Sequence, residues 1–152
     1  QSARTVPADL DREDRIRLAR IGMIGELGEI AEIFKKESYH NKPIDKIKIS
    51  KECGDFLWYL AVYSRACNVE NTDIDEIDID VCIEVVFDLV KFVAFPMSPP
   101  WYDIRFMFSA INRILSINNI TLSDCLELNV EKLKIRYPDG FDIDRSRTHN
   151  SE

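Results

Sequence analysis

The pattern of apolar and polar positions predicts helices almost throughout the chain. Apolar residues recur every three or four positions, glycine is scarce, and no long run alternates polar with apolar residues. The expected helices cover approximately 7–36, 45–67, 80–95, 101–117 and 121–138. The sequence therefore predicts an all-α protein, a bundle of about five helices in a single domain over 1–144, followed by a polar tail over 145–152.

The first predicted helix combines glycines with carboxylates. Residues 20–36 contain three of the five glycines in the chain, at positions 22, 25 and 28, together with glutamates at 26, 29 and 32. A glycine inside a helix costs about 1 kcal/mol relative to alanine, so three of them require a reason. One reason is that a helix surface made of glycines has no side chains, which leaves room for a ligand to lie against the helix.

This helix is apolar on nearly all sides. Its expected core face consists of Met23, Leu27, Ile30 and Phe34. The opposite side carries the glutamates together with Leu18, Ile21 and Ile33. We therefore expect a helix that is buried on both sides with carboxylates inside, and buried carboxylates require a cation. A solvated acidic face is the simpler interpretation.

The second predicted helix repeats this design. Glu52 and Asp55 lie three residues apart on one side, next to Gly54. The other side forms a core face of Ile49, Phe56, Leu57 and Leu60. Four oxygen ligands from two antiparallel helices, without histidine or thiolate, suit a hard cation such as Mg²⁺ or Mn²⁺. A di-iron bundle would need Glu-x-x-His pairs, which are absent.

The fifth predicted helix has a polar edge. Its expected core stripe consists of Leu122, Leu126, Leu133 and Tyr137. Asn129, Lys132 and Arg136 border this stripe. Long basic side chains often lie flat along a protein surface, but these three together could reach phosphates and balance an acidic site.

Composition and charge narrow the function classes. A net charge of −7 argues against a nucleic-acid binder held by phosphate contacts, and two histidines in all argue against a histidine-based metal site or a catalytic triad. The four scattered cysteines have no zinc spacing and suit a reducing compartment. No signal peptide or membrane span is apparent, so we expect a cytoplasmic protein that binds neither nucleic acid nor membrane.

Three motifs resemble one enzyme family. "GELGEIAEIFKK" and "KECGDFLWYLA" resemble the paired ExxE and ExxD signatures of the MazG-like, all-α nucleoside triphosphate pyrophosphohydrolases, and "NVEKLKIRYPDGF" is similar to their N-x-x-K-L-x-x-R-Y-P ending. A single ExxE occurs by chance in most helices, whereas two pairs in this order, followed by this ending, are specific. The match covers residues 20–67 and 121–141.

The resemblance implies a helical bundle that binds Mg²⁺ and works as a homodimer or homotetramer. It implies hydrolysis of a (deoxy)nucleoside triphosphate between the α and β phosphates, which gives a nucleoside monophosphate and pyrophosphate. By motif position, the metal ligands are Glu26, Glu29, Glu52 and Asp55, and Glu29 is the candidate base for the attacking water. The candidate substrate contacts are Trp58, Tyr59, Asn129, Lys132 and Arg136.

The chain departs from the family pattern between about 72 and 119, where the family commonly has a short link. Aromatic-rich helices in such an insertion are most often core or subunit interface. Alternatively, Trp101, Tyr102 and Phe106 shape a pocket for the base. Two other functions remain open: a non-catalytic helical interaction module, which has no reason to keep buried carboxylates, and a redox metal protein, which lacks the histidines. The sequence does not name the base.

Overall fold

The structure is a computed structural model that describes residues 6–7, 9–69, 84–96 and 98–138. The helices are α1 (Arg12–His40), α2 (Lys46–Ala66), α3 (Glu84–Ala94), α4 (Pro100–Ile117) and α5 (Leu122–Arg136). Over these ranges the chain forms no strand, which confirms the all-α prediction and its five helices. The predicted polar tail and part of the predicted insertion lie outside the described residues.

Polar side chains fix several helix ends. The carboxylate of Asp11 accepts a hydrogen bond from the backbone N–H of Asp14, so α1 begins at Arg12 and not directly after Pro7. Asp45 caps α2 in the same way, and the Thr121 hydroxyl caps α5. These caps satisfy backbone donors that have no partner inside the helix.

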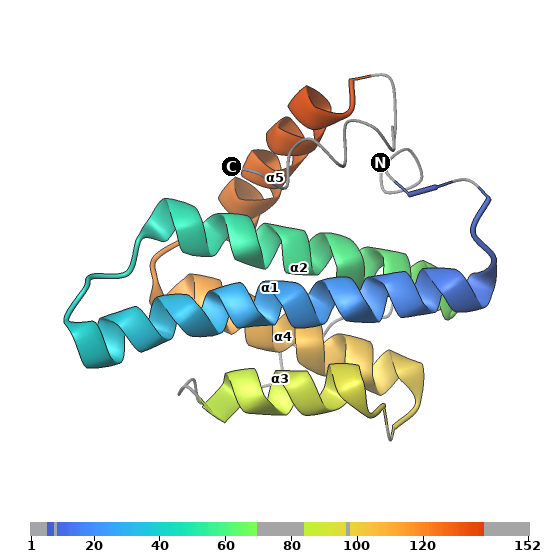
Figure 1. Cartoon of the computed structure of the whole chain (residues 1–152), viewed down its shortest axis with the longest axis horizontal. Coiled ribbons are helices and arrows are strands. Elements are labelled where there is room, and N and C mark those ends of the chain that lie inside the picture. The colour runs from blue at the N-terminus through green and yellow to red at the C-terminus, as the bar shows by residue number, and fades with distance from the viewer. Residues whose placement is uncertain (1–5, 8, 70–83, 97, 139–152) are drawn as a thin grey trace.

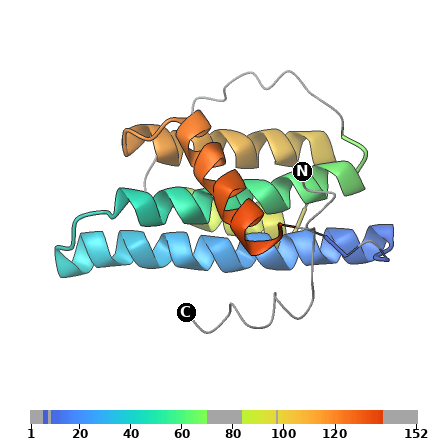
Figure 2. The ribbon, with the colours of Figure 1, turned by 90° about the horizontal axis from the view of Figure 1, so that it is seen from above.

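The helices form two packed layers with α5 above them. Helices α1 and α2 lie side by side and antiparallel, with α3 and α4 on one side of this pair (Figure 1). Helix α5 packs mainly on α2 and runs across it toward α1 (Figure 2). No helix in the described parts of the chain is long and apolar enough to cross a membrane.

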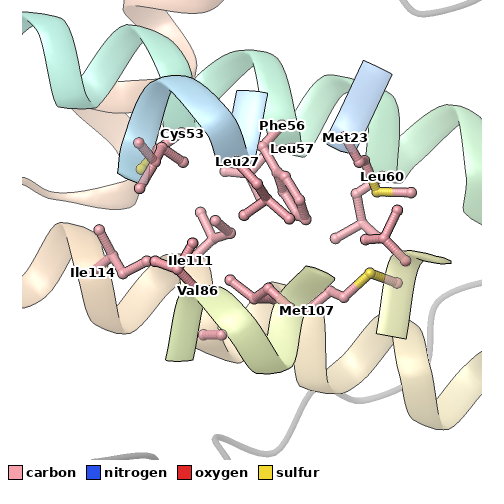
Figure 3. Close-up of a cluster of buried hydrophobic side chains, with 14 of the residues drawn as sticks. Met23, Leu27, Cys53, Phe56, Leu57, Leu60, Val86, Met107, Ile111 and Ile114 are labelled. Carbon is pink, nitrogen blue, oxygen red and sulfur yellow. The ribbon is translucent and has the colours of Figure 1, made fainter. Parts of the chain in front are cut away.

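The hydrophobic core lies between α1, α2, α3 and α4 (Figure 3). The predicted core faces of the first two helices are confirmed, except that Phe34 is only partly buried. Their buried members are Met23, Leu27, Ile30, Ile49, Phe56, Leu57 and Leu60. Helices α3 and α4 contribute Val86, Leu89, Met107 and Ile111, so the described part of the insertion belongs to the core.

Two expectations about burial are borne out only in part. On the second side of α1, Ile33 is buried and Leu18 is half-buried, but Ile21 is 65% exposed among the described residues, as are Ile24 (42%), Gly25 and Gly28. Helices α2 and α3 cover the other sides of α1, and no further helix among the described residues lies on this side. Apolar residues all round a helix show what could be buried, but not that the same chain buries it.

The predicted core stripe of α5 is also borne out only in part. Leu122 packs against the core, but Leu126 is 41% exposed, and the only buried side chains among the described residues of this helix are Cys125 and Asn129. Cys125 donates to the carbonyl oxygen of Ser50 at 3.2 Å, and Asn129 hydrogen-bonds to Asp55. These contacts with α2 turn α5 so that its polar edge faces the bundle.

Candidate metal centre

Three carboxylates meet where α1 faces α2. Glu26 comes from α1, and Glu52 and Asp55 lie one turn apart on α2. One carboxylate oxygen from each of the three lies within 4.8 Å of the others, and all three residues are partly buried. The antiparallel packing of the two helices therefore joins the two acidic motifs into one cluster.

Burial and mutual repulsion disfavour the charged forms of these acids. Burial, followed by the charges of Asp55 and Glu52, raises the pKa of Glu26 to about 7. Burial, followed by the charge of Asp55, also raises the pKa of Glu52. Lys132 opposes both shifts without cancelling them. The cluster therefore holds more negative charge than its neighbours neutralise, and a cation would relieve this imbalance.

Helix α5 reaches this cluster through Asp55. The amide Nδ2 of Asn129 donates to Asp55 Oδ1 at 2.6 Å, and the ammonium group of Lys132 forms an ion pair with Asp55 Oδ2. The sequence analysis expected these residues to reach phosphates and to balance an acidic site, and their contacts with Asp55 fit the second expectation. Asp55 thus has a partner on each of its oxygens.

Two of the four described glycines make room for side chains of this chain. A β-carbon at Gly22 would overlap the ring of Tyr59, and one at Gly54 would stand 3.0 Å from Cβ of Asn129. By contrast, β-carbons at Gly25 and Gly28 would meet nothing within 4 Å. The expectation that the glycines clear space for a ligand therefore needs correction, because Gly22 and Gly54 receive Tyr59 and Asn129.

Glu29 lies beside the three-acid cluster and not in it. Its side chain is 57% exposed, and its carboxylate lies 3.7 Å from the ammonium group of Lys48. Its charge still contributes to the raised pKa values of Glu26 and Glu52, after the larger contributions of burial and Asp55. Sequence reasoning missed Lys48, although its position four residues before Glu52 places it on the same side of α2.

Glu32, the third glutamate of the first motif, does not reach the cluster. It forms ion pairs with Lys35 and Lys36 on the surface of α1. These pairs lower the pKa of Glu32, the hydrogen bond from Lys35 being the largest cause. This residue fits the simple interpretation of a solvated charge on an amphipathic helix.

Aromatic and basic side chains border the cluster. The rings of Trp58 and Tyr59 meet edge to face with centroids 4.7 Å apart. Burial, followed by the charges of Glu26 and Asp55, raises the pKa of Tyr59, while Arg136 lowers it. Tyr59 therefore lies within electrostatic range of both the acids and the guanidinium of α5.

The aromatic residues of the insertion lie elsewhere. Phe106 and Tyr102 pack near Phe92 of α3, with ring centroids 4.4 Å and 6.5 Å from it, and Trp101 packs on Tyr102. In the single chain, α3 and α5 lie on opposite sides of the α1–α2 pair (Figure 1). These residues therefore complete the contact between α3 and α4, as the interpretation as core residues expects, while a role in shaping a pocket for the base stays a prediction.

The donors of the cluster fit a hard cation. All three are carboxylate oxygens, half-buried and close enough together to share one ion. No histidine or thiolate joins them among the described residues, so softer metals have no preferred ligand. The cluster could hold a metal ion.

Comparisons with protein-family models, with curated proteins and with solved structures find no match for this chain. The site therefore stands on its own geometry. That geometry joins residues from both acidic motifs and from the C-terminal motif of the sequence.

Proposed function

We propose that the protein is a metal-dependent nucleoside triphosphate pyrophosphohydrolase. It would cleave a (deoxy)nucleoside triphosphate between the α and β phosphates and release a nucleoside monophosphate and pyrophosphate. The observation that carries this proposal is the cluster of Glu26, Glu52 and Asp55 within 4.8 Å, built from two helices that each carry an acidic motif. The resemblance of these motifs to the MazG-like enzymes supports the reaction class.

The carboxylates supply the metal-binding part of the chemistry. When bound, Mg²⁺ or Mn²⁺ would neutralise phosphate charge, orient the triphosphate and acidify an attacking water. Glu26, Glu52 and Asp55 would hold the ion. Glu29, exposed at the edge of the cluster, is the candidate base, because its carboxylate can accept a proton from a water that approaches from solvent.

We assign substrate binding to residues of α2 and α5. Lys132 and Arg136 supply positive charge for phosphates, and Arg136 lies over the ring of Tyr137 with its Cζ atom 5.4 Å from the ring centroid. Asn129 fixes Asp55 and is a further candidate polar contact. Half-buried Trp58 offers a flat apolar surface to a base.

The test is a screen of nucleoside triphosphates and deoxynucleoside triphosphates with Mg²⁺, scored for release of pyrophosphate against phosphate. Activity should vanish with chelator, and Glu→Gln at 26, 29 or 52 should abolish it while the helix content stays unchanged. Glu32→Gln is the matched control, because its carboxylate pairs with surface lysines of the same helix. Retained turnover in the three variants would refute the assignment.

The alternative is a non-catalytic helical interaction module. The exposed apolar side of α1 favours it, since no described residue of the chain covers Ile21 and Ile24. The burial of Glu26 and Glu52 beside Asp55 argues against it, because a binding module gains nothing from carboxylates whose pKa values are raised. Failure to turn over any nucleotide would favour this alternative.

We also propose that the protein is a homo-oligomer, and that two copies meet through the α1 outer face, defined as Ile21, Ile24, Gly25 and Gly28. If two copies of α1 pair antiparallel about a two-fold axis near Ile24 and Gly25, each isoleucine faces a glycine of the other copy. The same register places Arg17 opposite Glu32, so the charges also complement one another.

A dimer and a tetramer are both compatible with this contact. A cytoplasmic location, which the free thiols of Cys53, Cys67 and Cys125 suit, stays a prediction.

A further inference from the structure

Lys132 pairs with one acid of the candidate metal centre. Its ammonium group forms an ion pair with Asp55 Oδ2, and Asp55 is one of the three acids whose oxygens converge. The pair is well shielded, with the side chain of Lys132 32% exposed and that of Asp55 21% exposed. A cation is therefore already present in the cluster before any metal arrives.

The influence of Lys132 extends beyond Asp55. Burial raises the pKa of Glu26 and of Glu52, and Lys132 is a positive charge that opposes both shifts. The ammonium group contacts Asp55, which supplies one of the three carboxylate oxygens that lie within 4.8 Å of one another. A divalent ion held by the same three carboxylates would lie within a few ångströms of this ammonium group, where two positive charges repel strongly in a half-buried site.

We propose that Lys132 is the resident counter-ion of the candidate metal centre: it pairs with Asp55 while the centre is empty, and it is displaced when a divalent cation binds. This inference rests on the proposed function, because it requires that the three carboxylates bind a metal. The displaced ammonium group is then free to contact a phosphate. Lys132 thereby neutralises part of the negative charge of the acids when no metal is bound, and it contacts the substrate when a metal is bound.

The anchoring of α5 allows this exchange without unfolding. Cys125 holds the first half of the helix on Ser50, and Asn129 fits into the space above Gly54. Neither contact involves Lys132. A lysine side chain has four flexible methylene groups, so its ammonium group can leave Asp55 while the backbone stays in place.

After this exchange, the released ammonium group of Lys132 would lie near the guanidinium group of Arg136. Arg136 lies one helical turn after Lys132 on the same edge of α5. Arg136 and the acids act on the same side chain, Tyr59, so this edge of α5 already reaches the cluster. An ammonium group released from Asp55 would join this guanidinium and form a paired positive surface for a polyphosphate.

The first test is calorimetric titration of Mg²⁺, and separately Mn²⁺, into the nucleotide-free protein. Lys132→Met should bind the metal several-fold more tightly than the wild type, because the ion no longer competes with an internal cation. The matched control is Lys134→Met, which removes an exposed lysine from the same helix and should change the affinity less than twofold. Helix content measured for each variant establishes that it is folded.

The second test uses the wild-type protein, so it does not depend on a variant that folds. Lysines are modified with an amine reagent and the rate at each site is followed by mass spectrometry, with and without Mg²⁺. Lys132 should react several-fold faster when the metal is present, whereas Lys134 should not change.

The outcomes separate the two proposals. If the wild type binds metal, but Lys132→Met binds it equally or more weakly and the modification rate of Lys132 does not respond to metal, the counter-ion inference is refuted and the metal site stands. If the wild type binds neither ion, the metal site itself is refuted, and the inference falls with it.

Discussion

The ring of Tyr59 lies directly over Gly22, so α1 and α2 approach one another closely at the edge of the acidic cluster. A β-carbon at position 22 would overlap the ring, whereas one at Gly25 or Gly28 would meet nothing within 4 Å. Glycine at position 22 is therefore a packing requirement. Its role is to seat an aromatic side chain that borders Glu26.

Replacing Gly22 with alanine should destabilise the protein by about 1–3 kcal/mol, because the added methyl group forces Tyr59 out of its place. Gly25→Ala is the matched control. Its β-carbon enters open space, so the better helix propensity of alanine should raise the free energy of unfolding by about 0.5–1 kcal/mol. Urea denaturation at a protein concentration too low for association measures both. Equal effects of the two substitutions would contradict this account of Gly22.

The sequence predicted the helices well because hydrophobic periodicity reports which side of a helix can be buried. Met23 and Leu27 on α1, and Phe56 and Leu60 on α2, lie in the core as their spacing indicates. Periodicity does not report what covers a second apolar side. Ile21 was therefore expected inside, although no element of the described chain covers it.

The candidate site was predictable only within single helices. Glu52 and Asp55 lie one turn apart, so any α-helix places them together. Whether Glu26 or Glu29 faces them depends on the rotation and offset of α1 against α2, which core packing decides. The rotation of α5 likewise follows from Cys125 and Asn129, two residues that hydrophobicity alone does not single out as a contact face.

Asp103 provides a test of stability away from the acidic cluster. It is fully buried near the start of α4, and its carboxyl oxygens have no hydrogen-bond partner among the described residues. Burial raises the pKa of Asp103, and the nearby Ser98 hydroxyl offsets only part of that shift. The folded state therefore binds the proton more tightly than the unfolded state, so stability falls as the pH rises above the ordinary pKa of an aspartic acid.

Asp103→Asn should raise the free energy of unfolding by about 1–2 kcal/mol at pH 8, because the amide carries no charge to bury. At pH 4 and below, where the wild-type carboxyl is increasingly protonated, the difference should shrink toward zero. Denaturation curves across this pH range measure it. A gain that does not depend on pH would mean that ionisation of Asp103 is not its cause.

Glu26 should make metal binding depend on pH. Its pKa is raised to about 7, so its carboxyl group titrates near neutral pH, and a cation needs the ionised form. Affinity for Mg²⁺ should therefore rise as the pH increases from 6 to 8, with release of protons that calorimetry in buffers of different ionisation enthalpy can count. Glu26→Gln should bind at least tenfold more weakly and lose most of this pH dependence.

The same substitution should stabilise the metal-free protein. The pKa of Glu26 is higher in the folded chain than its ordinary value of 4.5, so ionisation costs stability as the pH rises from about 4.5 through 7. With chelator present, Glu26→Gln should be more stable than the wild type by about 1 kcal/mol at pH 8 and equally stable at pH 4. Loss of stability at pH 8 would show that the Glu26 carboxylate is not strained by its surroundings.

The α1 outer face should control the oligomeric state. Ile24→Lys places a charge at the centre of the proposed two-fold contact and should convert the oligomer to monomer in analytical ultracentrifugation. Ile135→Lys is the matched control, since Ile135 is 84% exposed on α5 and lies outside this face. A wild type that is monomeric at every concentration, or that dissociates equally with both substitutions, would contradict the proposed contact.

The register of that contact can be tested by exchanging charges. In the antiparallel arrangement Arg17 of one copy faces Glu32 of the other, so Arg17→Glu should weaken association by creating a like-charge pair on each side of the axis. Adding Glu32→Arg to Arg17→Glu should restore association, because the charges are then exchanged and again complementary. In each chain Arg17 already pairs with Asp14 and Glu32 with two lysines, so Glu32→Arg alone serves as the control for lost intrahelical pairs. We expect each single substitution to weaken association and the double substitution to restore it. This combination is expected only if Arg17 and Glu32 meet across the axis.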